Sequence, residues 1–363
     1  MWHSRFAKPE IDTVMNRIRK WLIVSPLFLL ISGCGSVAYY SQAINGHLTL
    51  MSEAKPLDRL LANPDTPEKL KRELKWAEEI RNFAFSELKL PDNGSYRKYV
   101  QLDRPYVVWN VVATPELSLV PKTTCAPVAG CVAYRAYYHK EAAEAYASRL
   151  ERKAYDTYVG GVVAYSTVGW FRDPLLSSMM RGGIPDLAGV IFHELGHQAV
   201  FTKSDTAFVE SFATVVETEG VRRWLLQQND KSFGNYLDRQ KRFDQVIDLL
   251  LKYRKKLQVI YGSTQADLIK QEQKKKLFAQ LLRDYKLLKK SWGGYAGFDD
   301  WMSHDLNNAK LASVGDYHQW VPSLDHLLKE CDGDLPCFYK RANEIAKLKP
   351  KDRLQELKRL AQS

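Results

Sequence analysis

Two histidines and a glutamate form an H-E-L-G-H motif at residues 193–197 of this sequence. The motif lies within residues 186–201, where apolar side chains recur at helical spacing. Positions i and i+4 share one face of a helix, so the imidazoles of His193 and His197 can bind one metal ion. Glu194, beside the first histidine, is placed to take a proton from a metal-bound water. The motif predicts a catalytic metal site with two histidine ligands and Glu194 as the general base.

A third ligand has to come from another segment, because catalytic zinc usually has three protein ligands and a water. Residues 205–228 predict a second helix, capped by Asp205 or Thr206. Glu210 lies in an apolar turn near its start, where a carboxylate requires a compensating partner. The short connection at residues 202–204 returns the chain antiparallel and brings this carboxylate beside the two histidines. We therefore expect Glu210 as the third ligand and one Zn²⁺ as the cofactor.

Two more polar residues follow on the same predicted helix. Thr214 lies one turn after Glu210, and Glu217 lies two turns after it. Either side chain could orient a histidine ligand, and either could serve packing alone. The sequence leaves both interpretations open.

Several stretches resemble known zinc peptidases. The Val209-Glu210-Ser211-Phe212-Ala213 turn is similar to the Asn-Glu-Gly-Phe-Ala turn of aminopeptidase N relatives, which are gluzincins. Nearly the whole chain resembles a bacterial family of predicted aminopeptidases that are often lipoproteins. The other matching stretches are LPDN at 90–93 with Ser95-Tyr96, VWNV at 108–111, PVAGC at 127–131, AYSTVGWF at 164–171, DPLL at 173–176 and LNNA at 306–309.

The resemblance implies zinc-dependent hydrolysis of a peptide substrate, with an aminopeptidase as the expected activity. It carries over His193, His197 and Glu210 as metal ligands and Glu194 as the base. It also implies a helix-rich α+β fold, with a gluzincin-like catalytic core, a small mixed or antiparallel sheet and a C-terminal helical region.

The sequence departs from the family pattern at three places. Gly196 stands where the family usually has Ala, which would leave room for the metal, and Val209 replaces the usual Asn. The Gly-x-Met-Glu-Asn loop, with which aminopeptidase N relatives hold the free amine of a substrate, is absent from the sequence. A zinc endopeptidase therefore remains an alternative. The second alternative is a non-catalytic, peptidase-like lipoprotein that acts as a scaffold or chaperone.

An aromatic residue upstream of the motif is a candidate for the oxyanion donor or a substrate contact. Residues 160–171 predict a strand, and Tyr165 lies in it. Gluzincins place a substrate-pairing edge strand before the metal-binding helix, which is why Tyr165 is singled out. A core role is the alternative for an aromatic residue in a strand. His304 and Tyr317 are weaker candidates.

The N-terminus has the pattern of an export signal. A basic segment at residues 15–20 precedes the apolar run 21–33, which is too short to span a membrane. The run ends in Leu-Ile-Ser-Gly before Cys34 and resembles a bacterial lipobox. We expect residues 1–33 to be a signal peptide, with translation starting at Met15, and Cys34 to carry the lipid that anchors the chain to a membrane. The expected location is the bacterial cell envelope, facing the periplasm, and Gly35 in place of Asp favours the outer membrane.

Four more cysteines follow Cys34, in two closely spaced pairs. Exported thiols tend to form disulfides, and four cysteines allow three connectivities. The simplest is two local loops, Cys125–Cys131 and Cys331–Cys337. Zinc binding is the competing interpretation, but zinc knuckles usually separate their ligands by two to four residues.

The remaining chain is expected to form one zinc-peptidase domain, residues 34–363. Residues 90–230 should contain the sheet and the metal-binding helices, and residues 231–363 a helical part. Strands are predicted at 106–113 and 132–138. Helices are predicted at 67–90 after a Thr66 cap, at 141–155, and as a hairpin over 243–290.

The charge balance first raises the question of nucleic-acid binding. The 363 residues carry a formal net charge of +11, and 45% are hydrophobic, which excludes a disordered chain. The expected signal peptide contributes +3 of that charge. The rest lies largely in the predicted hairpin, where a solvated basic helix face explains it. We expect no nucleic-acid partner.

Overall fold

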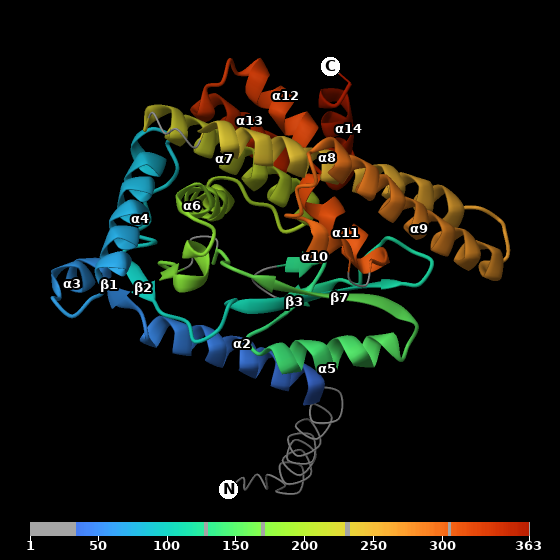
Figure 1. Ribbon diagram of the computed structural model, residues 1–363, viewed down its shortest axis with the longest axis horizontal. Coiled ribbons are helices and arrows are strands. Elements are labelled where there is room, and N and C mark those ends of the chain that lie inside the picture. Colours follow the sequence, from blue (N-terminus) through green and yellow to red (C-terminus); the bar gives the residue numbers. More distant parts are fainter. Residues whose placement is uncertain (1–33, 127–129, 168–170, 229–232, 304–305, 363) are drawn as a thin grey trace, which may run out of the picture. The chain divides into compact units, whose positions relative to one another are not determined.

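The computed structural model describes residues 34–126, 130–167, 171–228, 233–303 and 306–362 (Figure 1). The chain divides into two compact units, one ending at Leu50 and one from Met51 to Ser363. Helix α2 (Cys34–Ser52) begins at the expected lipidation site. The expected signal peptide, residues 1–33, lies outside the described residues. Among the helices that are described, none combines the length and the apolar character that crossing a membrane requires.

The larger sheet of the second unit is antiparallel, in the order β6-β3-β7. Its central strand β3 (Val108–Pro115) pairs with β6 (Arg135–Tyr137) and with β7 (Tyr155–Val162). Helices α5 (Lys140–Glu151) and α11 (Asn308–His318) both contact β3 and β7, from opposite sides of the strands (Figure 1). Coverage on both faces explains why consecutive β3 residues are buried instead of every second one.

Two smaller sheets complete the β structure of the part of the chain that the structure describes. One is mixed: β2 (Lys98–Val100) pairs antiparallel with β1 (Lys55–Pro56) and parallel with β8 (Leu175–Leu176), which leads into η1 (Ser177–Met180). The other is a hairpin of β4 (Thr124–Ala126) and β5 (Gly130–Val132), with Cys125 opposite Cys131 and joined to it by a disulfide. The helix-rich α+β fold with small sheets that was expected is confirmed.

The first long helix of the second unit packs behind the metal-binding motif. Helix α3 (Leu57–Ala62) precedes α4 (Glu68–Ser86). The prediction that Thr66 caps α4 is wrong: Pro67 occupies the cap position, and no side chain caps the helix. The helix also ends at Ser86 instead of residue 90. Phe83 on α4 contacts the rings of two later helices, Phe192 at 5.9 Å and Trp224 at 5.1 Å.

The predicted helical hairpin is formed by α8 (Phe233–Tyr261) and α9 (Asp267–Ser291), followed by α10 (Asp299–Ser303). Its core includes buried Leu250, Tyr253 and Leu281. Lys274 does not belong to the expected solvated face. Its Nζ lies 2.6 Å from Oδ2 of Asp156 on β7 and attaches the hairpin to the sheet.

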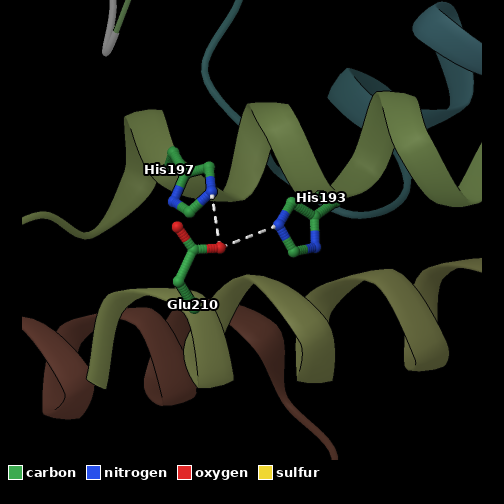
Figure 2. Close-up of side chains that lie close together, drawn as sticks. All are labelled: His193, His197 and Glu210. Atoms are coloured by element: carbon green, nitrogen blue, oxygen red, sulfur yellow. Dashed lines mark ion pairs between the residues drawn. The ribbon is translucent and has the colours of Figure 1, made fainter. Parts of the chain in front are cut away.

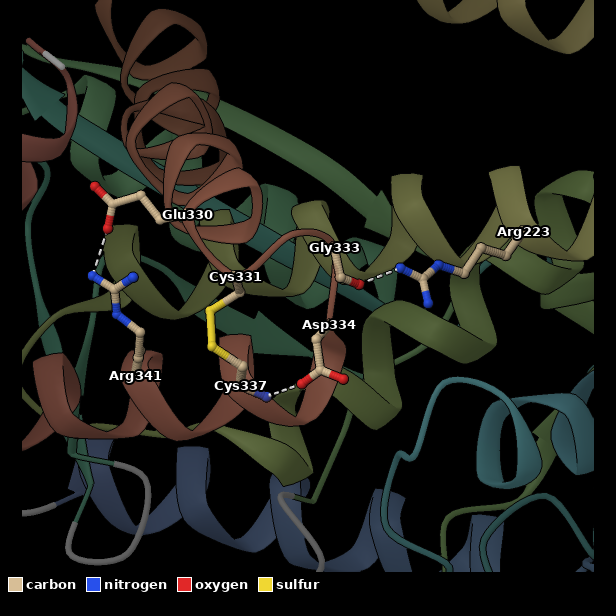
Figure 3. The surroundings of a disulfide bond; sticks show 7 residues. All are labelled: Arg223, Glu330, Cys331, Gly333, Asp334, Cys337 and Arg341. Atoms are coloured by element: carbon tan, nitrogen blue, oxygen red, sulfur yellow. Dashed lines mark hydrogen bonds and ion pairs between the residues drawn. A yellow bond between two sulfur atoms is a disulfide. The ribbon is translucent and has the colours of Figure 1, made fainter.

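The C-terminal helices carry the second disulfide. Cys331 is joined to Cys337 between α12 (Val321–Glu330) and α13 (Leu335–Lys347), and α14 (Pro350–Leu360) follows (Figure 3). Asp334 caps α13 by accepting a hydrogen bond from the Cys337 backbone N–H at 2.7 Å. Arg223 donates to the Gly333 carbonyl at 2.5 Å. This contact ties the disulfide loop to the helix of Arg223, which carries a predicted metal ligand.

Candidate metal centre

The predicted metal ligands lie on α6 (Ile184–Ala199) and α7 (Thr206–Gln227). Helix α6 begins and ends two residues before the predicted range of 186–201. Gly183 precedes it with a φ of 95°, a conformation that glycine adopts without strain, and Pro185 lies in its first turn. Of the two predicted caps of α7, Asp205 fills the position and accepts a hydrogen bond from the Phe208 backbone N–H at 3.0 Å.

Gly196 on α6 lies against the neighbouring helix α7. A Cβ at this position would lie 3.4 Å from the Ala213 Cα and 3.5 Å from the Val216 Cβ, both on α7. The missing side chain therefore faces the neighbouring helix. That glycine at this position leaves room for the metal stays a prediction.

The three predicted ligands converge between the helices (Figure 2). Oε2 of Glu210 lies 3.4 Å from Nε2 of His193 and 3.6 Å from Nε2 of His197. One ligand atom from each residue lies within 4.8 Å of the others, and among the described residues this is the one cluster of three or more such ligands. Two ligands held tetrahedrally at about 2.0–2.1 Å from zinc lie about 3.4 Å apart, so this donor set fits the ion.

Glu217 fixes the orientation of the first histidine. Nδ1 of His193 donates to Oε2 of Glu217 at 3.0 Å, which leaves Nε2 directed at Glu210. Thr214 instead donates its hydroxyl to the backbone carbonyl of Glu210 at 2.9 Å. Of the two residues that the sequence left open, Glu217 contacts a predicted ligand ring. Gly189 makes space for it, because a Cβ there would lie 3.0 Å from Oε1 of Glu217.

Burial and mutual charge set the protonation of the site. Burial raises the pKa of Glu194 to about 8. Burial alone would also raise the pKa of Glu210, but the two imidazoles outweigh it and lower that pKa. Burial lowers the pKa of His197 to about 4. The pKa of His193 is raised, because hydrogen bonds to Glu210 and Glu217 outweigh its burial. The metal-free cluster thus holds an ionised Glu210 beside a neutral His197, and a metal ion would have to displace the proton that Glu210 and Glu217 stabilise on His193.

The buried Asp173 connects two segments of the chain near Glu194 by hydrogen bonds. Asp173 accepts hydrogen bonds from the Thr167 hydroxyl at 2.7 Å and backbone N–H at 3.0 Å, and its own N–H donates to the Ser95 hydroxyl. Tyr96 is 2% exposed, and its hydroxyl has no hydrogen-bond partner among the described residues. Its pKa is raised, first by burial and also by the charges of Glu194 and Asp173. Three of the family-like stretches therefore meet beside the predicted base.

Tyr165 lies outside the strand in which it was predicted. Strand β7 ends at Val162, and residues 163–167 form no regular structure. The Tyr165 hydroxyl hydrogen-bonds to the Tyr138 hydroxyl at 2.8 Å, and burial raises its pKa far above the usual value. The strand prediction was wrong because its apolar run continues past the last ladder pair. His304 and the side chain of Tyr317 lie outside the described residues.

Sequence reasoning missed His318, at the end of α11. The backbone N–H of Trp320 donates to the hydroxyl of Ser211, the neighbour of Glu210, at 3.1 Å and attaches this end of α11 to α7. The pKa of His318 is lowered to about 4, mainly by burial; the charge of Glu217 opposes this shift, and that of His193 adds to it. No local pattern links residue 318 to residue 210, so only the fold reveals the proximity.

Comparison with known proteins identifies a family for this chain. The family model with the description "Putative aminopeptidase" matches residues 38–357. Neither the curated proteins nor the solved structures gave a match.

Proposed function

The chain belongs to the aminopeptidase family whose model it matches, and on this premise we propose that it is a zinc-dependent peptidase. Family membership implies a peptidase that acts on peptide substrates. The convergence of His193, His197 and Glu210 on packed helices, with Glu194 adjacent, carries the proposal that zinc is the cofactor. The core would then be of the gluzincin type.

The proposed chemistry divides the work among four residues. His193, His197 and Glu210 would hold the ion, which when bound polarises the scissile carbonyl and acidifies a water. Glu194 takes the proton of the attacking water and delivers it to the leaving amine. The burial that raises its pKa makes the Glu194 carboxylate a stronger proton acceptor than an exposed glutamate. Tyr165 remains our candidate for substrate contact or oxyanion stabilisation.

The mode of cleavage is the first thing to test. The family favours removal of N-terminal residues, whereas the missing Gly-x-Met-Glu-Asn loop favours internal cleavage. We would digest a peptide library with free and with blocked N-termini and identify the products by mass spectrometry. Cleavage restricted to free N-termini supports an aminopeptidase, and cleavage within blocked peptides supports an endopeptidase.

A matched variant identifies the base. Glu194→Gln preserves the size of the side chain but removes its basicity, so zinc should stay bound while kcat falls by about 10²–10⁴-fold. Zinc content and kcat are measured on the same preparation. A kcat close to that of the wild type would remove Glu194 from the mechanism. A wild-type protein that binds no metal and cleaves nothing would favour the scaffold alternative.

We further propose that the enzyme is anchored in the envelope by lipid on Cys34, facing the periplasm and more specifically at the outer membrane. The lipobox-like sequence before this cysteine supports the anchor, and the two disulfides are compatible with an oxidising compartment. Metabolic labelling with radioactive palmitate should mark the wild type and not Cys34→Ala. Equal labelling of both would contradict the anchor.

A further inference from the structure

The free end of the α8–α9 hairpin exposes apolar side chains to solvent. The loop that joins the two helices lies at the right edge of Figure 1, and residues 259–269 form what we call the hairpin tip. Val259 is 75% exposed, Leu268 77% and Ile269 50%. Single exposed apolar residues are common, but three at one end of one element indicate a surface for a partner.

The exposed side chains of the tip do not belong to the hairpin core. Leu257 is fully buried and lies two residues before Val259, so Val259 lies on the opposite side of α8, about 200° around the helix. Lys270 lies two residues after Leu268 and is directed inward, where its Nζ donates to the Tyr261 carbonyl at 3.3 Å. Leu268 therefore lies on the outer side of α9, and the fold does not use either side chain.

Hydrogen bonds attach the tip to the rest of the second unit. The hydroxyl of Tyr261 donates to Oδ1 of Asn308 at 2.8 Å. From α9, Gln271 donates to the Glu116 carboxylate at 3.0 Å, and Lys274 donates to the Glu116 backbone carbonyl at 2.9 Å. The apolar side chains are thus presented by an ordered scaffold, which lowers the entropic cost of docking.

Positive charge lies directly behind the apolar tip. Residues 252–276 contain eight Lys and Arg but two Asp and Glu. Lys255 and Lys276 are exposed, and neither forms an ion pair within the described part of the chain. Lys255 precedes Val259 by four residues, and Lys276 follows Ile269 by seven, so each lysine shares a helix face with an apolar residue of the tip.

The spacing between the two kinds of side chain matches the surface of a bilayer. At 1.5 Å per residue, Lys255 lies about 6 Å and Lys276 about 10 Å behind the apolar residues along the helix axes. Apolar side chains of interfacial helices enter the boundary between headgroups and acyl chains by about 5–10 Å, which leaves these lysines at the level of the phosphates.

Other partners would satisfy only half of this surface. A soluble anionic polymer would pair with the lysines but leave the apolar side chains in water. A neutral bilayer would bury the apolar side chains but offer no net charge to the lysines. A bilayer that contains anionic phospholipid provides both interactions.

We propose that the hairpin tip docks end-on on a bilayer surface that contains anionic phospholipid, with its three exposed apolar side chains in the interface and Lys255 and Lys276 at the phosphates. This proposal goes beyond the proposed peptidase function and does not depend on it. The contact is made by the second unit and is separate from the lipid that we propose on Cys34.

A dye on the tip tests the contact directly. The full chain is made with Cys34→Ala, so that it carries no lipid, and Leu268→Cys is labelled with an environment-sensitive fluorophore, since the other four cysteines form disulfides. Vesicles of phosphatidylglycerol and phosphatidylcholine should shift the emission to shorter wavelength, and vesicles of phosphatidylcholine alone should not. The same dye at Leu226→Cys, an exposed position on α7, is the control and should show no shift.

Removing charge should weaken the contact. Titration of the labelled protein with the anionic vesicles gives the affinity. Lys255→Gln combined with Lys276→Gln should lower it at least about tenfold, and salt at about 0.5 M should do the same for the unmodified tip. Lys340→Gln combined with Lys347→Gln removes the same charge from exposed positions on α13 and should leave the affinity unchanged.

Removing apolar surface should also weaken the contact, at constant charge. Val259→Ser should lower the affinity for the anionic vesicles about tenfold. Leu354→Ser changes an exposed apolar residue on α14 and should have no effect. All these positions are exposed, so the circular dichroism spectrum should match that of the wild type.

Several results would overturn the proposal. These are a tip label that does not respond to anionic vesicles, an equal response to both vesicle compositions, and an equal response to soluble polyglutamate. A shift without vesicles that grows with protein concentration would instead identify a second copy of the chain as the partner. The readout requires no hydrolysis, so failure of the peptidase function would leave this test unaffected.

Discussion

The metal centre and a cavity of about 390 Å³, which lies between the β3–β7 sheet and the helices that cover it, are built in opposite ways. The metal centre takes its three ligands from two consecutive helices, within residues 193–210, and it consists of buried ionisable groups that compensate one another. The residues that line the cavity are spread between positions 110 and 318, on strands and helices of the second unit. Among the described residues of this lining there is no carboxylate, lysine or arginine. The two regions thus differ in origin and charge: the metal centre gathers ionisable groups from one local segment, and the cavity gathers uncharged side chains from distant segments.

The largest loss of zinc and of activity should follow from removing one of the predicted metal ligands. Glu210→Ala leaves two histidines, which are too few for tight zinc binding, so zinc content should fall from one ion per chain to none and hydrolysis should stop. Zinc is measured by elemental mass spectrometry on the purified protein.

The same helix offers a control for this variant. Glu219 lies on α7 and forms ion pairs with Arg222 and Arg223 at 2.6 and 2.7 Å, away from the ligands. Glu219→Gln should keep its zinc. If Glu210→Ala retained a full complement of zinc, the proposed ligand set would be incorrect.

A smaller effect should follow from disturbing the support of His193. Glu217→Gln weakens the bond to Nδ1, and Gly189→Ala places a Cβ 3.0 Å from Oε1 of Glu217. Loss of such a supporting bond typically costs 10–100-fold in metal affinity, which competition with a zinc chelator measures. Gly196→Ala, whose Cβ would make ordinary contacts at 3.4–3.6 Å, serves as the control. Equal affinities in all three variants would show that Glu217 does not position the ring.

The smallest expected effect is a pH-dependent change in stability that is caused by His318 in the cavity wall. The pKa of His318 is lowered to about 4 from an unfolded value of 6.5, so between these values the unfolded chain binds a proton that the folded chain does not. Stability is therefore lost as the pH falls from 6.5 towards 4. On acidification from pH 7.5 to pH 5, the free energy of unfolding of His318→Gln should therefore fall by about 2 kcal/mol less than that of the wild type.

Urea unfolding of both proteins at pH 7.5 and pH 5 measures this difference. The other titrating groups are the same in both proteins, so their contributions cancel when the two changes in stability are compared. Parallel stability curves would mean that His318 is protonated within the fold, and the cavity would then not be uncharged.

The sequence predicts the metal centre well because its information is local. Helical spacing places His193 and His197 on one face, and a short connection returns Glu210 to them; the structure brings these three together within two residues of the predicted helix bounds. Glu217 was identified as a candidate, but its partner ring depends on how the two helices pack.

Other features depend on long-range packing and were missed or mispredicted. The strand at 160–171 ends early, because hydrogen bonding to β3 stops at Val162. Asn110 and His318 lie more than 200 residues apart, and only the covering of the sheet by α11 brings them to one cavity. Periodicity and spacing contain no information on that contact.

X-ray absorption at the zinc edge of the purified protein tests the metal centre most directly. The proposed ligand set predicts nitrogen and oxygen neighbours at about 2.0–2.1 Å, with the multiple scattering of two imidazoles, and the signal should disappear in Glu210→Ala. A sulfur shell at about 2.3 Å, or a wild-type protein without zinc, would contradict it.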